Sequence, residues 1–267
     1  MPGAACKSST CWAPMPQCKV DADCLARGAE FMGGKCAASQ CLANPRWRCE
    51  PPVVATTMET KKLRMLVRDS LSLSAVADVH VVACQKLDLT CAQPVKDATT
   101  GSDGYLNIEL PANFAGYLQQ TERRDYSPAM YFLPQVFPAD GMLQPFPLLG
   151  SGVIINALAA ALGAGIDAKR GHLMLIAEDC MGMALAGVSF MSPQRDPQTV
   201  QFYVRDLLPS TTATDTAEVG NGGFLNFPSG TAVINVTQTK TNLDLATVSV
   251  VVRAGYISVA YIRPRAR

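Results

Sequence analysis

Ten cysteines are the residues of this 267-residue chain whose type and spacing most directly indicate chemistry. Seven crowd the first fifth of the chain and three follow: Cys6, Cys11, Cys18, Cys24, Cys36, Cys41 and Cys49, then Cys84, Cys91 and Cys180. A zinc site needs close cysteine pairs matched by a second pair or by histidines, and His80 and His172, the only histidines, lie far from the cluster. The spacing therefore favours disulfide bonds, with no metal and no cofactor.

Catalytic side chains are scarce. Both histidines fall in expected strands, and no serine-nucleophile elbow, phosphate loop or Cys-x-x-Cys motif accompanies them. Three carboxylate pairs could support glycoside hydrolysis, but each is expected at a strand end or turn: Glu178/Asp179, Asp206/Asp215 and Asp97/Asp103. Asp21, Asp23 and Asp103 could attract calcium, yet no twelve-residue calcium loop is present. We predict that the protein is not an enzyme.

Disulfide bonds persist in oxidising compartments, so the cysteines predict an exported protein, extracellular or on the outer cell surface. The first ten residues lack a charged segment followed by an apolar run, so we expect no cleavable signal peptide and a mature or trimmed chain. The longest apolar stretch, 150–166, is interrupted by Asn156 and is too short to span a bilayer. A net charge of +1 without a basic stripe argues against nucleic acid as a partner.

Residues 1–55 combine the cysteine cluster with few periodic apolar positions, so bridges must hold this head and its linker together. After it, short β-rich runs separated by turn signals predict a first β-sandwich over 60–135, the first half, and a second over 172–265, the second half. The runs are 63–67, 79–83, 104–110, 116–119 and 129–133, then 173–177, 187–191, 200–204, 224–227, 232–236, 247–252 and 257–262.

Two stretches suggest that the halves are repeats. Asp103-Gly104-Tyr105-Leu106-Asn107 and Gly222-Gly223-Phe224-Leu225-Asn226 each open a strand with glycine and an aromatic residue, and a proline follows, at a period near 110 residues. Gly104 and Gly223 are expected in tight turns that need positive φ. Between the halves, residues 136–171 form a proline-rich connector with a short helix at Ser151–Leu162, capped by Ser151 and stopped by Gly163. We expect this helix in the seam between the sandwiches.

Both halves resemble the transthyretin-like sandwich called the carboxypeptidase regulatory-like domain, and more loosely the collagen-adhesin B-type repeat. The residues that carry the resemblance are 79–84, 94–95, 98–100 and 103–111, then 186–189, 214–217, 223–224, 228–231 and 252–264. A cysteine-rich head before two such sandwiches is similar to exported proteins of δ-proteobacteria of the myxobacterial type. The resemblance implies an all-β protein of two tandem immunoglobulin- or transthyretin-like antiparallel sandwiches, with a disulfide-rich N-terminal segment and one short helix.

Two disulfide pairings can be proposed from the residues. Cys84 and Cys91 bracket a six-residue loop, so a bridge between them would fix the register of the strands that the loop joins. If they pair, seven head cysteines and Cys180 remain, and seven cannot pair among themselves. We therefore expect Cys180 to be bridged to the head, which makes the two sandwiches one compact body.

The expected function is binding or scaffolding, because loops on a rigid sandwich carry recognition. The binding candidates are Tyr126, Tyr131, Phe137 and Phe146 near the connector, and Phe202, Tyr203 and the 209–216 loop in the second half. The alternative is that these aromatic rings fill the seam between the domains. The partner would be a protein or polysaccharide surface, or another copy of the chain. Alternative functions are a self-assembling filament or coat subunit and a carbohydrate-binding or carbohydrate-active accessory module.

Blocked thiols are the first testable consequence of the cysteine pattern. We expect thiol titration of the denatured, non-reduced protein to find all ten cysteines unreactive, because export allows each to be oxidised. The reduced protein is the control and should give ten thiols. More than two free cysteines without reduction would contradict export.

Overall fold

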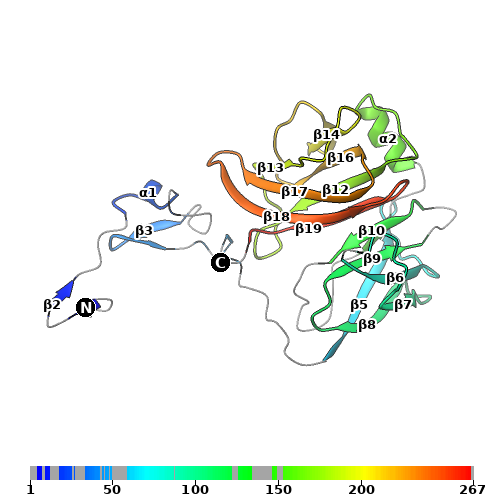
Figure 1. Cartoon of the computed structure of the whole chain (residues 1–267), viewed down its shortest axis with the longest axis horizontal. Helices are drawn as coiled ribbons and strands as arrows, with labels where there is room; N and C mark the ends of the chain where they lie inside the picture. Colours follow the sequence, from blue (N-terminus) through cyan, green and yellow to red (C-terminus); the bar gives the residue numbers. More distant parts are fainter. Residues whose placement is uncertain are drawn as a thin grey trace.

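The chain is mostly β-strand, with several sheets, short helices and a disulfide-rich N-terminal segment (Figure 1). The computed structural model describes residues 59–86, 88–121, 126–133, 146–148 and 153–265. From the head it describes residues 5–7, 10–12, 18–25, 27, 34–42, 44, 46, 47 and 49. Each of the β-rich runs predicted from the sequence coincides with a strand of this structure to within one residue at the start or overlaps it.

A single nine-stranded sheet runs through both halves of the chain. Its order is β15-β14-β16-β12-β19-β10-β9-β6-β7. From one edge to the other these strands are Leu208–Ser210, Val200–Arg205, Asn221–Phe227, Gly171–Ala177, Ile257–Ile262, Ala129–Phe132, Gly116–Gln120, His80–Gln85 and Lys96–Thr99. The sandwiches are therefore fused through their backbones, which the sequence did not predict.

Strand β19 joins the strands of the two halves into one sheet. It is hydrogen-bonded in parallel to β10 of the first half and to β12 of the second, with Ile257 opposite both Ala129 and His172. Parallel neighbours cannot be joined by a tight hairpin, so a long crossover between them is required. The chain from β12 to β19, which carries β13 to β18, serves as that crossover for the β12–β19 pair. β10 and β12 lie on either side of β19, and the chain between them carries β11 (Phe146–Leu148) and helix α2 (Val153–Ala161).

Two three-stranded sheets complete the layers: β11-β5-β8 and β13-β17-β18. Their remaining bounds are Thr60–Asp69 (β5), Tyr105–Pro111 (β8), Val188–Met191 (β13), Gly230–Gln238 (β17) and Leu243–Val252 (β18). Alternate residues of the central sheet enter different cores. Tyr131 and Val259 pack with the β5 and β8 side chains, whereas Met130 and Ala260 pack with those of β17 and β18. Since side chains alternate along a strand, the two outer sheets cover opposite faces of the central sheet.

The two halves have related strand pairings. In the first half, β5 is antiparallel to β8, and it is parallel to β11 of the connector. In the second half, β12 is antiparallel to β16 and parallel to β19. The strands β8 and β16 are the two that carry the glycine-aromatic sequences. The halves are thus similar sandwiches, and the central sheet joins the second sheet of one to the first sheet of the other.

Helix α2 covers part of the central sheet. Its buried residues are Ile155 and Ala159, and Leu158 packs against two core clusters. Ile155 joins the first-half core, while Ala159 packs with Phe202 and Leu225 of the second half, which agrees with a position in the seam. Gly163 follows the helix with a φ of 65°. The expected N-cap, Ser151, lies outside the described residues.

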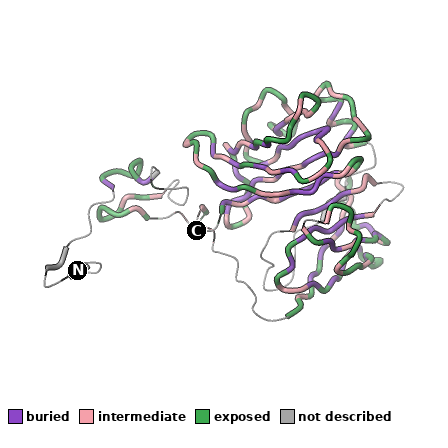
Figure 2. The backbone as a smooth tube through the Cα atoms, in the orientation of Figure 1, coloured by how far each residue is buried: buried purple, intermediate pink, exposed green. Residues whose placement is uncertain are grey.

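The head has little apolar interior. It contains the hairpins β1–β2 (Ala5–Lys7, Thr10–Trp12) and β3–β4 (Lys35–Ala37, Gln40–Leu42) and a one-turn helix, α1 (Ala22–Leu25). Disulfides Cys18–Cys36 and Cys24–Cys41 hold its described part. Burial is concentrated in the three-layer body, while the described part of the head is mostly exposed (Figure 2). The side chains of Cys6 and Cys11 lie outside the described residues.

Two glycines of the repeat have different roles. Gly104 has a φ of 76° in the turn before β8, as expected, and an added Cβ would lie 2.7 Å from the Cβ of Ala75. The expectation of a tight turn at Gly223 is wrong, because this residue lies inside β16. An added Cβ there would lie 2.0 Å from the carbonyl oxygen of Leu173 on β12. Close approach of two backbones explains this glycine.

Gly223→Ala should therefore destabilise the protein strongly. We expect a loss of more than about 2 kcal/mol in unfolding free energy, because the methyl group clashes with the backbone of a central strand. Gly165→Ala is the matched control, since an added Cβ there meets nothing within 4 Å. Chemical denaturation of both variants checks this, and equal stability of the two would contradict the close approach.

Candidate functional site

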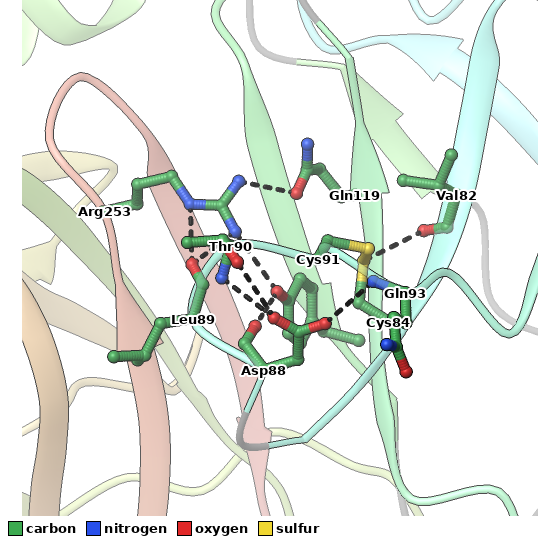
Figure 3. The surroundings of a disulfide bond; sticks show 10 residues. Val82, Cys84, Asp88, Leu89, Thr90, Cys91, Gln93, Gln119 and Arg253 are labelled. Carbon is green, nitrogen blue, oxygen red and sulfur yellow. Dashed lines mark hydrogen bonds between the residues drawn. A yellow bond between two sulfur atoms is a disulfide. The ribbon is translucent and has the colours of Figure 1, made fainter.

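Arg253, in the turn between β18 and β19, ties the two halves together on one side of the central sheet (Figure 3). Its guanidinium donates to the carbonyl oxygen of Leu89 at 2.6 and 3.0 Å and to the side-chain oxygen of Gln119 at 2.7 Å. It also donates to the Tyr117 hydroxyl at 3.2 Å and lies over the Tyr256 ring. Hydrogen bonds from a charged donor are among the stronger ones, so these contacts of Arg253 connect the two halves. We call them the Arg253 clasp.

The Arg253 clasp binds a loop through the carbonyl oxygen of Leu89. The Cys84–Cys91 disulfide closes this loop, and the Cα atoms of the two cysteines are 5.3 Å apart. This is the pairing expected from the sequence. Inside the loop, the Asp88 side chain accepts hydrogen bonds from the backbone N–H groups of Thr90 and Gln93, and Tyr117 donates its hydroxyl hydrogen to the Asp88 carbonyl oxygen (Figure 3). Burial raises the pKa of Tyr117 and keeps the hydroxyl protonated as a donor. These hydrogen bonds and the disulfide stabilise the conformation of the described part of the loop.

The head docks on the second half at the turn after β12. Cys49 is bonded to Cys180, which agrees with the expected bridge between Cys180 and the head. The N–H of Cys180 donates to the carbonyl oxygen of Arg46 at 2.9 Å, and Trp47 packs against the second-half core. The Arg46 side chain forms an ion pair with Asp179, whose side chain is fully buried. One covalent and several non-covalent contacts thus fix the same junction.

Asp179 also organises the turn that follows it. Its side chain accepts the backbone N–H groups of Met181 and Met183, both at 2.9 Å. Burial opposes the charged form, but the Arg46 side chain and these N–H groups together hold the pKa of Asp179 below its usual value. A buried carboxylate with these partners stabilises the head junction and is not free to act as an acid or base.

The other carboxylate candidates are also engaged. Glu178 pairs with Arg263 at 2.9 Å. Asp215 accepts hydrogen bonds from Arg205 and, at 2.8 Å, from Thr239. The remaining contacts of the candidate acids lie on the exposed surface: Asp97 with His80 at 3.3 Å and Asp103 with Arg64 at 3.7 Å, while Asp206 lies at the tip of the β14–β15 hairpin with a φ of 50°. Most of these positions match the strand-end and turn roles expected from the sequence, whereas Asp97 lies inside strand β7 (Lys96–Thr99).

His172 is buried and accepts the N–H of Asn226 through Nδ1 at 3.3 Å. Asn226 has a φ of 51°, and its side chain holds the segment before β12 through the N–H of Asp167 and the carbonyl oxygen of Gly165. Burial lowers the pKa of His172 to about 4, because the imidazolium would lose its hydration. The histidine is therefore part of a neutral structural network.

The possible metal ligands are occupied by other bonds. The sulfur atoms of Cys18, Cys24 and Cys41 lie within 4.8 Å of one another, but each belongs to a disulfide and is not a thiolate. Asp21 accepts the N–H of Cys36 at 2.7 Å, and Asp23 accepts those of two preceding residues. Two of the three carboxylates that could attract calcium thus cap the backbone of the head, and the third, Asp103, accepts the N–H of Tyr105 at 3.1 Å.

The aromatic residues expected to bind a partner lie mostly in the core. Tyr131, Phe202 and Tyr203 are between 0% and 3% exposed, and Tyr126 packs against the first-half core. Tyr203 also accepts the N–H of Phe190 through its hydroxyl at 2.8 Å. The structure thus places these rings in the hydrophobic cores and not on the exposed surface. Phe137 and the side chain of Phe146 lie outside the described residues.

The exposed apolar surface is aliphatic. Met181 and Met183, in the turn after β12, are 71% and 60% exposed, and Leu207 and Leu208, in the β14–β15 hairpin, are 82% and 69% exposed. Since β12 and β14 are both antiparallel to β16, these residues leave the central sheet at the same end, where the head docks. No aromatic side chain described by the structure is classed as exposed. Sequence reasoning missed this aliphatic rim because Leu and Met usually indicate buried positions.

Comparisons with known proteins give distant structural likenesses only. No family model matches the sequence, and no curated protein matches it. Similar solved structures include the shaft pilin SpaA of Lactobacillus rhamnosus GG, with 12% identity over 78% of this chain and 99% of that chain and a TM-score of 0.27. Another is the minor pilin GBS52 of Streptococcus agalactiae, with 12% identity over 77% of this chain and 96% of that chain and a TM-score of 0.26. Likenesses this distant carry no argument about function.

Membrane insertion by a helix has no support in the described residues, because none of their helices is long and apolar enough to cross a bilayer.

Removal of the Arg253 clasp should weaken the whole body. We expect Arg253→Ala to lower the unfolding free energy by about 1–3 kcal/mol, because three acceptors from the first half lose a charged donor. Arg195→Ala is the matched control, since Arg195 is exposed and bonds only to the Gln201 side chain among the contacts described. Urea denaturation compares them, and equal effects would rule out a special role for Arg253.

Acid should destabilise the protein through His172. The pKa is about 4 when folded and about 6.5 when unfolded, so the unfolded state binds more protons between these values. Stability should be intact above pH 6.5 and fall as the pH drops toward 4, by roughly 3 kcal/mol in total. His172→Gln should flatten this slope, whereas His80→Gln, which removes the surface histidine, should keep it. Parallel slopes for both variants in denaturation series would contradict the assignment.

Proposed function

We propose that the protein is an exported, non-catalytic scaffold that works outside the cell or on its outer surface. The observation that carries the proposal is the set of disulfides: each cysteine whose side chain the structure describes is bridged. One bridge, Cys49–Cys180, joins segments 131 residues apart and fixes the head to the body. Such bridges persist in oxidising compartments and are rare where thiols are kept reduced.

The engagement of the catalytic candidates supports a non-catalytic role. The buried acids, Glu178 and Asp179, have arginine partners, and the buried histidine accepts a backbone N–H. A general acid or base must have a proton position open to substrate. Here the contacts of these groups connect chain segments, so their role is to hold a rigid body that presents the head and the aliphatic rim at one end.

Fractionation of the native cell, followed by intact mass measurement, tests the proposal. We expect the protein in the extracellular or outer-surface fraction, with a mass that rises by two hydrogens per bridge on reduction. Ten cysteines allow five bridges, and a cytosolic protein with free thiols would overturn the proposal.

A variant separates the covalent and non-covalent parts of the head junction. Cys49→Ser/Cys180→Ser removes the long-range bridge but leaves Arg46, Trp47 and Asp179 in place. We expect it to be exported and folded, with faster hydrogen exchange in the head than in the body, because the tether is lost. Faster hydrogen exchange in the outer sheets of the body than in the head would contradict the described junction.

A further inference from the structure

The two outer sheets present different chemistry to solvent. On β5 and β8 the outward side chains include Lys62, Arg64 and Glu109, and Arg64 stacks on Tyr105 at 3.6 Å. This is a charged, solvated surface of the usual kind. The outward surface of β13, β17 and β18 differs, because its central positions carry no charge.

We call this second surface the hydroxyl face. Its members are exposed or half-buried and alternate with core residues along their strands. They are Ser189, Met191, Thr231, Val233, Asn235, Thr237, Thr247 and Ser249. Strand register makes them contiguous: Asn235 is opposite Thr247 and Met191, and Thr237 is opposite Ser189. The nearest charge on these strands, Asp244, stands at the end of the face beside Thr237.

Depletion of charge is a property of surfaces that become covered, since charged residues are scarce at the centre of interfaces. The same chain maintains charge on the equivalent outward surface of β5 and β8, so overall composition does not explain the difference. The hydroxyl face is therefore a candidate contact surface, and the chemistry of its partner can be argued from three constraints.

The area of the face argues against a second copy as a stable partner. Three strands about 4.8 Å apart and about five residues long, at about 3.3 Å per residue, give roughly 200 Å². A stable protein interface covers about 800 Å² on each partner, so the face is about a quarter of what a dimer needs.

The strand edges argue against an extended peptide that would add to the sheet. At the open edge of β13, Tyr203 accepts the N–H of Phe190, and Gln201 donates to the Phe190 carbonyl oxygen at 2.7 Å. At β18, the carbonyl oxygens of Leu245 and Val251 accept from Arg265 and Ser258. A peptide strand needs a run of free N–H and C=O groups along an edge, and the contacts above interrupt that run at Phe190 of β13 and at two carbonyl oxygens of β18.

We propose that the hydroxyl face binds uncharged polysaccharide. Threonine side chains offer a hydroxyl group and a methyl group together, which match the alternating hydroxyl and C–H surfaces of a neutral sugar chain. No ion has to be desolvated on either side. A polymer can also be retained by a face of small area, because repeated weak contacts along one polymer chain add by avidity. The proposal rests on export, since it needs a partner outside the cell, and it specifies the class of ligand.

Retention of the full chain on insoluble cellulose and chitin tests the proposal, with dextran sulfate beads as the charged comparison. We expect retention on at least one neutral polymer that is unchanged between low and high salt, because uncharged contacts are not screened. Asn235→Lys should reduce retention by at least about fivefold, since the contact would bury an unpaired charge. Thr231→Lys is a second variant with the same expected result.

Asn107→Lys is the matched control, because it places the same charge on an exposed asparagine of β8. It should leave retention within about twofold of the parent, as it lies on the charged sheet. No retention on either neutral polymer, salt-sensitive retention, or equal loss in Asn107→Lys and Asn235→Lys would overturn the proposal. So would a result in which Asn235→Lys and Thr231→Lys alter only self-association in light scattering. If the protein still fractionates outside the cell with its bridges intact, the scaffold function stands and only the ligand is wrong.

Discussion

The rest of the structure depends on the insertion of β19 between β10 and β12. Backbone hydrogen bonds on both sides of this strand turn two similar sandwiches into one three-layer body. Residues 257–262 are buried except Tyr261, which is half-buried, so the strand contributes to both main cores. The chain on each side of β19 reinforces the joint: Arg253 before it holds the disulfide loop of the first half, and Arg263 after it pairs with Glu178.

The buried ion pairs, like strand β19, connect segments that are far apart in the sequence. Asp179 and Glu178 end β12 in buried positions, and their partners come from distant segments, Arg46 of the head and Arg263 beyond β19. A buried carboxylate left without a partner is costly, so each arginine is required by the fold and not merely tolerated by it. The head junction and the central joint are therefore adjacent along the chain, and the Cys49–Cys180 disulfide lies at the same place.

The sequence predicted what is local and missed what depends on pairing between distant segments. Alternating apolar runs located the long strands, and cysteine parity led to the bridge between Cys180 and the head. The parallel pairing of β19 with β10 has no local signal, because it depends on strands from different sandwiches and a crossover between them. Short strands such as β7 and β15 lack an apolar run, and Pro209 in β15 reads as a turn residue. The aromatic candidates were expected to be exposed, whereas Tyr131, Phe202 and Tyr203 lie in strands of the central sheet and are buried.

The fusion also bears on why the two outer sheets differ in surface chemistry. Each outer sheet covers one face of the central sheet and leaves its own outward surface to solvent. The residues on these two outward surfaces can therefore differ without any change in the cores. The β5–β8 surface keeps charges suited to water, while the hydroxyl face gives up charge without a gain in core packing, since its residues point away from the core. A solvent-facing change that does nothing for stability is better explained by contact with something outside the protein. Glu178, Asp179 and His172 join chain segments in the body, so we propose the hydroxyl face and the aliphatic rim as the surfaces that recognise a partner.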